Sequence, residues 1–362
     1  MSRGTCAVIH LDNIRHNLQV ARRHAPHSRI WAVVKANAYG HGLVPVAQML
    51  AAEADGLAVA TLDEALTLRA AGINSPVLLL EGVVSMAQTQ TALDADLELV
   101  VHTMDQRHWL AEASVQQAVR VWLKVDTGMR RLGFMPAEAG AEYAHLQALP
   151  QVATVSFMTH YARADDPAHA MTPQQYDCLH SVVPAGCEAS LANSGGVLFW
   201  PGRQGDWVRP GIMLYGATPA PEQSRDRLGL RAGMTLYAPI IALRDLVPGD
   251  TVGYGGGFST DRPLRLATVA MGYADGYPRH APNDTPVAIN GIRCRLVGRV
   301  SMDMLTVDVT GLQDIGPGTP VELWGPHVAV DEVAQAAGTI GYELLAGLAL
   351  RGRYDYVTER CS

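Results

Sequence analysis

Short apolar runs recur every 20 to 30 residues between residue 30 and about residue 215. They predict strands at 30–35, 56–60, 76–80, 97–101, 119–125, 152–158, 187–191 and 206–209. Amphipathic segments between them predict helices, among them 43–53, 62–72, 104–117, 136–147 and 173–183. Alternating strands and helices indicate a parallel sheet, and eight such units in a row predict a (β/α)8 barrel. A doubly wound open sheet is the competing topology, but no GxGxxG follows the first strand.

The pattern changes near residue 230, where turn signals begin to separate β-rich runs. The runs lie at 235–246, 265–271, 286–289, 293–299, 303–309 and 319–324, and a helix is expected near 330–337. We therefore predict an α/β protein with a barrel domain over 10–230 and a mostly β domain over 231–362. The sequence leaves open whether residues 1–9 join the β domain or cap the barrel.

Composition narrows the class of protein. The chain has 362 residues, 48% hydrophobic and 17% charged, which is typical of a globular protein. A net charge of −7 and a pI near 6.0 argue against a nucleic-acid partner. No apolar run approaches the roughly 18 residues of a membrane span, so a cytoplasmic location is the default expectation. The cysteines form no CxxC pair and the histidines no HExxH motif, so no metal is expected.

Lysine is rare in this chain. Of its 28 Lys and Arg residues only Lys35 and Lys124 are lysines, and each ends an apolar strand. Arginine stays protonated, whereas lysine can act as an amine nucleophile, a Schiff-base former or a proton carrier. A strand-end lysine that only reaches for water is the alternative interpretation, and the rarity of lysine weakens it.

Other polar residues gather at the predicted strand ends, which is where barrel enzymes place their catalytic groups. The last two strand ends carry Ser194, in a Ser-Gly-Gly turn, and Gly211-Ile212. Barrel phosphate sites are usual at this position, and backbone N–H groups with a hydroxyl suit an anion. A phosphate site beside a strand-end lysine suggests pyridoxal phosphate as the cofactor.

Several long motifs carry a resemblance to a known family. They are Val34-Lys35-Ala-Asn-Ala-Tyr39-Gly-His-Gly, Lys124-Val-Asp-Thr-Gly-Met-Arg-Arg131-Leu-Gly, Val208-Arg209-Pro-Gly211-Ile, Gly253-Tyr254-Gly, Gly272-Tyr-Ala-Asp-Gly-Tyr277 and Ser301-Met302-Asp303-Met. From about residue 6 to about residue 348 the chain resembles bacterial alanine racemase, a pyridoxal-phosphate enzyme of the barrel type. The resemblance implies interconversion of L- and D-alanine, for cell-wall D-alanine supply or alanine breakdown, by a head-to-tail homodimer with shared active sites.

The resemblance also implies roles for single residues. Lys35 matches the Schiff-base lysine and one of two acid/base groups, and Tyr254 matches the opposing base, supplied by the other subunit. Arg209 matches the residue facing the pyridine nitrogen. The positions that match phosphate contacts are Tyr39, Ser194, Gly211, Ile212 and Tyr342.

The remaining matches concern the substrate and its surroundings. Arg131 and the Met302 backbone match groups near the substrate carboxylate, with Asp303 supporting them. His160 matches a site residue close to Tyr254 and Arg209. Lys124 matches a lysine that is often carbamylated and then pairs with the Arg131 position; a simple Lys124–Asp126 ion pair is the alternative.

Elementary chemistry agrees with these roles. Racemisation removes a proton from one face of Cα and delivers one to the other, which two groups on opposite sides do best. Tyr254 needs cationic neighbours or hydrogen bonds that favour its phenolate, and His160 and Arg131 are the expected sources. Arg209 has only donors, so it leaves the ring nitrogen unprotonated.

Three rival functions remain. A barrel decarboxylase, or a broader racemase, would share the Lys35 chemistry, but a decarboxylase usually has an acid where Arg209 lies. A non-catalytic pyridoxal-phosphate carrier would leave the Tyr254 domain unexplained. A metal-dependent hydrolase would use His160, Asp126 and a carbamylated Lys124.

Overall fold

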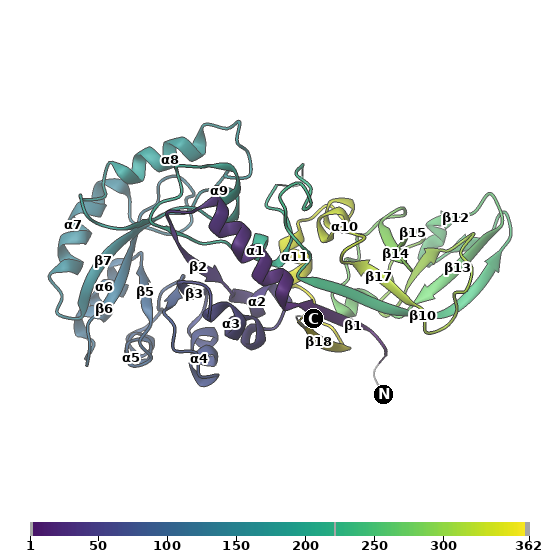
Figure 1. The fold of residues 1–362 in the computed structure, drawn as a ribbon, viewed down its shortest axis with the longest axis horizontal. Coiled ribbons are helices and arrows are strands. Elements are labelled where there is room, and N and C mark those ends of the chain that lie inside the picture. Colours follow the sequence, from purple (N-terminus) through teal and green to yellow (C-terminus); the bar gives the residue numbers. More distant parts are fainter. Residues whose placement is uncertain (1–2, 221, 359–362) are drawn as a thin grey trace. The chain divides into compact units, whose positions relative to one another are not determined.

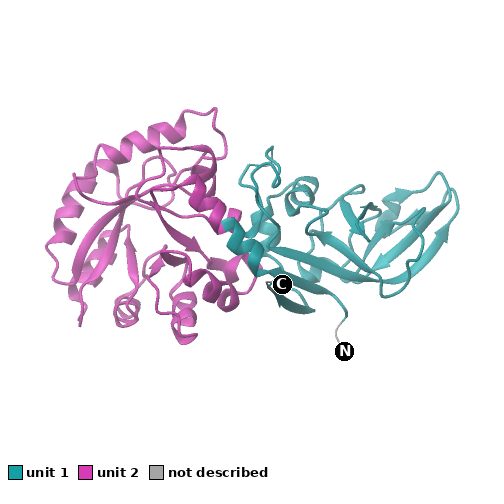
Figure 2. Ribbon diagram, in the orientation of Figure 1, with its two compact units in different colours: residues 1–17, 215–362 teal, residues 18–214 magenta. Residues whose placement is uncertain are grey.

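The computed structural model describes residues 3–220 and 222–358, and its chain divides into two compact units. Unit 2 comprises residues 18–214, and unit 1 comprises residues 1–17 with 215–362 (Figure 2). The domain boundaries expected from the sequence, 10–230 and 231–362, stay a prediction.

Unit 2 is a closed barrel of parallel strands, which confirms the predicted fold class (Figure 1). Its strands are β2 (Arg29–Val33), β3 (Gly56–Val59), β4 (Val77–Leu79), β5 (Glu98–Val101), β6 (Val119–Lys124), β7 (Val152–Met158), β8 (Ala189–Ser190) and β9 (Trp207–Val208). The pairing of β2 with β9 closes the ring. All eight predicted strands overlap an observed one, and the open doubly wound sheet is excluded.

Helices follow the barrel strands. They are α2 (Lys35–Gly40), α3 (Leu43–Ala51), α4 (Leu62–Ala70), α5 (Met86–Asp94), α6 (Met104–Glu112), α7 (Pro136–Gln147), α8 (Met171–His180) and α9 (Ser194–Phe199). The short η1 (Ile212–Tyr215) follows β9, and α1 (Leu11–His24) contains the division between the two units. Serine or threonine side chains cap α4, α5 and α6, which sets where these helices begin.

Tryptophans fill the barrel interior. Trp31 stacks on Trp207 with ring centroids 4.5 Å apart, and its edge meets Trp122 at 6.2 Å. The three residues come from β2, β9 and β6, and β2 and β6 are not neighbours in the sheet, so the rings meet inside the barrel. Position 56 must be glycine because a Cβ there would collide with the Trp31 ring. The barrel is therefore a packed core, and its chemistry is confined to its rim.

Unit 1 is mostly β, as the sequence predicted. Its main sheet contains β1 (Cys6–His10), β10 (Met234–Leu246), β13 (Leu264–Val269), β14 (Pro286–Ile289), β15 (Ile292–Leu296), β16 (Leu305–Asp308), β17 (Pro320–Trp324) and β18 (Arg353–Val357). A pair of short strands, β11 (Thr251–Val252) and β12 (Phe258–Ser259), forms a second sheet. The helical segments are η2 (Tyr254–Gly256), η3 (Tyr273–Asp275), α10 (Val330–Ala336) and α11 (Gly341–Ala346).

The N-terminal segment, which the sequence left unassigned, belongs to the β sheet. Strand β1 pairs antiparallel with β10 and parallel with β18, so it lies between them (Figure 1). At the C-terminal end, strand β18 keeps a five-residue register with β1.

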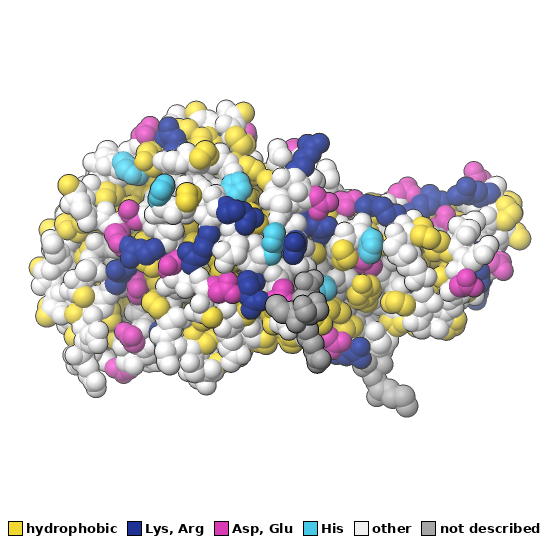
Figure 3. All heavy atoms as spheres, viewed as in Figure 1, with side chains coloured by type: hydrophobic (Ala, Val, Ile, Leu, Met, Phe, Trp, Pro, Cys, Tyr) yellow, Lys and Arg dark blue, Asp and Glu magenta, His cyan; other side chains and the backbone are white. Residues whose placement is uncertain are grey.

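The surface is mixed in charge. On the face seen in Figure 3, basic and acidic side chains are interspersed and no broad area carries one sign. Within residues 3–220 and 222–358, no helix is long and apolar enough to cross a membrane. In the same ranges no three His, Cys, Asp or Glu side chains are placed to share a metal ion.

Candidate active site

Lys35 lies where β2 ends, at the start of an unusual turn. Residues Ala36–Tyr39 all have left-handed backbone angles, with φ between 51° and 55°. Such a conformation costs about 1–2 kcal/mol for each non-glycine residue. Hydrogen bonds hold the turn: Ala38 N–H donates to the Val34 carbonyl at 2.8 Å, and His41 Nδ1 donates to the Tyr39 carbonyl at 2.8 Å. Strain maintained in this way is typical of functional sites.

Tyr39, at the far end of the turn, reaches the end of the last barrel strand. A Cβ on residue 211 would collide with Tyr39 Oη, so glycine is needed at 211 for the phenol to lie there. Ser194 Oγ accepts from the N–H groups of Gly211 (3.0 Å) and Met213 (3.4 Å), and Ile212 between them is fully buried. Burial raises the pKa of the Tyr39 phenol, which keeps it neutral and able to donate.

This set of groups fits a phosphate. It offers hydroxyls and backbone N–H groups and carries no carboxylate, and the glycine at 211 leaves room for the Tyr39 hydroxyl among them. The structure thus brings Tyr39, Ser194, Gly211 and Ile212 together at one end of the barrel.

Arg209 is buried and bonded on several sides. Its guanidinium donates to the Ser190 hydroxyl and to the carbonyls of Thr159 (2.6 Å) and Leu191 (3.1 Å). Burial, with a smaller contribution from Arg131, lowers the pKa of Arg209 to about 10, so the side chain stays charged at neutral pH. None of these partners is a carboxylate, and the group remains a donor.

His160 was expected to offer Tyr254 either positive charge or hydrogen bonds, and its surroundings bear on which of the two it can offer. Its imidazole is partly buried, and Arg209 Nη2 lies 3.3 Å from its Nδ1. Burial and the neighbouring cations Arg209, Lys124 and Arg131 lower the pKa of His160 well below its usual value. The imidazole is therefore neutral and can offer hydrogen bonds but not charge.

Lys124 ends β6 beside a tight loop. Asp126 N–H donates to the Phe134 carbonyl at 2.8 Å and Phe134 N–H donates to the Lys124 carbonyl at 2.9 Å, which folds residues 126–134 back onto the strand end. Gly133 at the closure has a φ of 129°, and a Cβ there would press on Asp126 N.

The Lys124 ammonium is in a cationic environment. Burial, followed by Arg209, Arg131 and Lys35, lowers the pKa of Lys124 to about 8. Within residues 3–220 and 222–358, no ion pair joins Lys124 to Asp126, which was the alternative expected from the sequence. Asp126 Oδ1 instead accepts from the N–H groups of Gly128 (2.9 Å) and Arg130 (3.0 Å).

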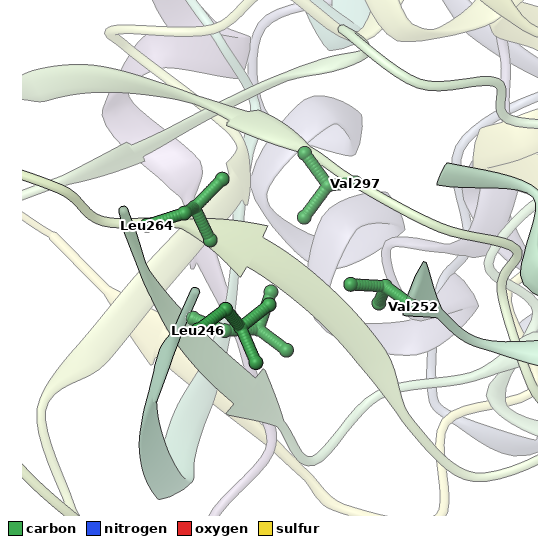
Figure 4. Close-up of a cluster of buried hydrophobic side chains, with 5 residues drawn as sticks. Leu246, Val252, Leu264 and Val297 are labelled. Carbon is green, nitrogen blue, oxygen red and sulfur yellow. The ribbon is translucent and has the colours of Figure 1, made fainter. Parts of the chain in front are cut away.

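Tyr254, Met302, Asp303 and Tyr342 belong to unit 1, whereas the other expected site residues belong to unit 2. Tyr254 is 71% exposed and lies in η2, with glycines at 253, 255 and 256 in left-handed conformations. The strands beside this turn are anchored by a buried cluster of Leu246, Val252, Leu264, Leu266 and Val297 (Figure 4).

Met302 lies on a loop that is held by the turn around Asp275. Tyr273 and Ala274 donate their N–H groups to the carbonyls of Ser301 (3.1 Å) and Met302 (3.0 Å). Gly272 must lack a side chain because a Cβ there would collide with the Met302 carbonyl.

Asp275 joins this loop to the ends of the chain. Its carboxylate is 1% exposed and accepts from Arg351 at 2.7 and 3.0 Å and from Arg3 at 3.3 Å; Arg351 also donates to Asp303 at 2.7 Å. Burial alone would raise the pKa of Asp275, but hydrogen bonds from Arg351 and the Gly272 N–H outweigh it and lower the pKa.

The sequence interpretation missed some supporting groups. Asp275 lies within the Gly272–Tyr277 motif, but nothing local indicated that it pairs with Arg351, 76 residues further along the chain. Glu64, which contacts the backbone of Ala36, could have been noticed from the Thr-x-x-Glu capping pattern at 61–64.

Comparison with known proteins identifies the family. Residues 9–219 match the N-terminal domain of alanine racemase, and residues 233–356 match its C-terminal domain. The chain belongs to the alanine racemase family. This match confirms three expectations: the family, the racemase class of enzyme, and a barrel followed by a mostly β domain.

Individual relatives extend along the full chain. An alanine racemase of Thioalkalivibrio sulfidiphilus is 49% identical over 99% of this chain and 100% of its own length. The biosynthetic alanine racemase of Pseudomonas aeruginosa, 45% identical, superposes with a TM-score of 0.93 over 98% of this chain and 99% of that one. The Bartonella henselae alanine racemase with covalently bound pyridoxal phosphate, 30% identical, covers 98% of this chain and 99% of its own at a TM-score of 0.86.

Proposed function

We propose that this protein interconverts L-alanine and D-alanine with pyridoxal 5′-phosphate held at the rim of the unit 2 barrel. The observation that carries the proposal is the strained turn that starts at Lys35 and ends at Tyr39, beside the anion-binding groups Ser194 and Gly211. An amine at one end and a phosphate cradle at the other match the two ends of this cofactor. Similarity to a biosynthetic relative favours D-alanine supply over alanine breakdown.

The residues of the chain would divide the work. When bound, pyridoxal phosphate supplies an aldehyde and a conjugated ring that withdraws electrons from the substrate Cα. Lys35 holds the cofactor and carries a proton at its Nζ on one face of the substrate. Tyr254 carries a proton at its Oη on the other face. Arg209 presents N–H donors to the ring nitrogen and does not release their protons.

The phosphate end is held by Tyr39, Ser194, Gly211, Ile212 and Tyr342. The substrate carboxylate is bound by Arg131 and the Met302 N–H, with Asp303 supporting the Met302 loop. His160, being neutral, contributes a hydrogen-bonding ring beside Arg209. A small substrate such as alanine is the expected occupant.

Tyr254 is proposed to act across a homodimer interface. Its 71% exposure supports this, because a proton-carrying phenol needs a more enclosed environment than this surface turn provides. In a head-to-tail dimer each active site would combine Lys35 of one subunit with Tyr254 of the partner subunit.

Lys124 is proposed to carry a carbamate. The ammonium first loses one proton; the neutral Nζ then adds to the carbon of CO2 and releases a second proton, so a negative charge replaces a positive one. The lowered pKa of Lys124, about 8, makes the neutral amine available, and the nearby cations Arg209 and Arg131 favour the anion. The carbamate would then pair with Arg131 and orient it toward the substrate.

The proposal is tested by turnover. Purified protein supplied with pyridoxal phosphate should convert optically pure L-alanine to a racemic mixture, followed by loss of circular dichroism, with no CO2 released. Lys35→Ala should remove this activity, while Asp165→Asn, at an exposed loop residue, should not. Release of CO2 would favour a decarboxylase, and absence of any reaction with a cofactor-loaded sample would favour a carrier.

A further inference from the structure

The left-handed turn after Lys35 is attached to the next barrel strand by a carboxylate. Glu64 Oε1 accepts from the Ala36 N–H at 2.6 Å. Glu64 Oε2 accepts from the N–H groups of Ala60 (2.9 Å) and Thr61 (3.2 Å), which lie just after β3. The side chain therefore joins the rim of β3 to the residue that directly follows Lys35.

Helix capping explains only half of these contacts. Glu64 is the third residue of α4, and the Thr61 hydroxyl accepts from the Glu64 N–H at 3.4 Å, which completes a capping box with Oε2. The bond from Oε1 to Ala36 spans 28 residues of sequence and satisfies no group of α4. It extends the tie between β2 and β3 beyond the last sheet contact, in which the Val34 N–H donates to the Ala58 carbonyl at 2.9 Å.

The first residue of the turn has little else to hold it. Ala36 is exposed and has a φ of 52°, an unfavourable angle for alanine, so packing contributes little to keeping it there. Further along, Ala38 and Tyr39 are buried and fixed by their surroundings. The hydrogen bond from Ala36 to Glu64 thus restrains the end of the turn that bears Lys35.

We propose that Glu64 is a positioning residue for Lys35: through Ala36 it keeps the left-handed turn closed, and the turn sets the spacing between the Lys35 amine and the Tyr39 hydroxyl. This inference rests on the proposed function, in which those two groups hold opposite ends of the cofactor. Small displacements of a reacting amine lower its reactivity steeply, so loss of the restraint affects covalent attachment more than folding.

Two single variants separate positioning from capping. Glu64→Ala removes both sets of contacts, whereas Thr61→Ala removes the threonine half of the capping box and keeps the bond to Ala36. Each is freed of cofactor, given back pyridoxal phosphate, and trapped with borohydride at short times. Mass spectrometry then gives the initial rate of pyridoxyl labelling at Lys35, with the amino terminus as an internal reference, and thermal unfolding gives the loss of stability.

Glu64→Ala is expected to slow labelling at Lys35 by about 10-fold or more, with labelling of the amino terminus unchanged. Thr61→Ala is expected to label Lys35 at the wild-type rate. Adding Ala36→Gly to Glu64→Ala should recover part of the lost rate, because glycine adopts left-handed angles freely and the exposed Ala36 side chain packs against little. If Glu64→Ala does not fold, Glu64→Gln serves instead, since an amide cannot accept on both sides.

Labelling of Lys35 at the wild-type rate in Glu64→Ala would overturn the inference, as would equal slowing in Thr61→Ala or no recovery with Ala36→Gly. These results leave the proposed function intact, because Lys35 is still labelled in the wild type. Absence of a Lys35 adduct in the wild-type protein would instead overturn the proposed function itself.

Discussion

Lys124 and Arg209 lie in the same barrel and differ in whether they can release a proton. Arg209 is buried, bonds to two backbone carbonyls and keeps its charge. Among the residues that the structure describes, Lys124 has no such partners, and its pKa falls to about 8. Burial among cations thus leaves the arginine a permanent donor and makes the lysine a reactive amine.

This difference predicts a carbamate that depends on pH. Protein equilibrated with ¹³C-bicarbonate should show one carbamate carbon by NMR, and Lys124→Ala should lack it. Because the pKa of Lys124 is about 8, the ammonium form prevails below that pH and cannot add to CO2. The signal should therefore weaken as the pH falls below about 8, and a wild-type spectrum without it would refute the modification.

At the residue scale, the sequence points to candidate residues for chemistry more readily than it reveals the charge states of their side chains. The rarity of lysine is enough by itself to single out Lys35 and Lys124 as candidates for chemistry. The neutral state of His160 could not be foreseen, because it depends on burial and on cations from distant parts of the chain. The bond between Glu64 and Ala36 was likewise invisible, since a capping pattern does not reveal a second partner.

At the scale of elements, hydrophobic periodicity located most strands and helices. The predicted strand at 152–158 and helix at 136–147 match their observed bounds. The left-handed backbone of Ala36–Tyr39 was not foreseen, because hydrophobic patterns do not reveal backbone handedness. Strand β18 was also missed, since its partner β1 lies at the other end of the chain.

The contact between α2 and the end of β9 gives a second prediction. Gly211→Ala places a methyl group against Tyr39 Oη, which must shift out of the phosphate cradle. Affinity for pyridoxal phosphate, measured by titration of the cofactor-free protein, should fall about 10-fold or more. Gly202→Ala is the control. Its Cβ would have open space around it, so even with the strain that alanine adds at a φ of 77° it should leave the affinity unchanged. Equal affinities for both variants would contradict the proposed cradle.

The turn of η3 predicts an acid-sensitive part of unit 1. The pKa of Asp275 is lowered in the folded state, so its bonds with Arg351 and Arg3 stabilise the protein fully above the unfolded pKa of about 4. This contribution is lost as the pH falls from about 4 through the lower folded pKa.

Asp275→Asn should therefore weaken the dependence of unfolding free energy on pH below about pH 4. At neutral pH it should cost about 1–3 kcal/mol by chemical denaturation, because two guanidiniums lose a charged partner. Asp165→Asn, at an exposed residue, is the matched control. Identical pH profiles for the Asp275 variant and the wild type would show that the carboxylate contributes no such stability.

At the scale of the whole molecule, the expected site residues are divided between two compact units. In the proposed function, unit 2 would supply most of the cofactor groups, and unit 1 would supply Tyr254, Met302 and the phosphate contact Tyr342. A sequence can assign residues to each unit, but it contains no direct information on which copy of the chain provides each set.

Sharing of sites between subunits predicts complementation. Lys35→Ala and Tyr254→Phe proteins should each be inactive, and hybrid dimers formed from them should regain activity, because one of their two sites carries both intact residues. A random mixture should approach about a quarter of wild-type activity, since half of the dimers are hybrids with one good site each. Continued inactivity after verified subunit exchange would place Tyr254 in its own subunit's site.

The most direct test of the account is to find which amine binds the cofactor. The purified protein is reduced with borohydride in the presence of pyridoxal phosphate, and the pyridoxyl adduct is mapped by mass spectrometry. Only Lys35, Lys124 and the amino terminus are available as amines, so the assignment is unambiguous. We predict an adduct on Lys35. A cofactor-replete sample that carries no adduct there, or carries it on Lys124 alone, would contradict it.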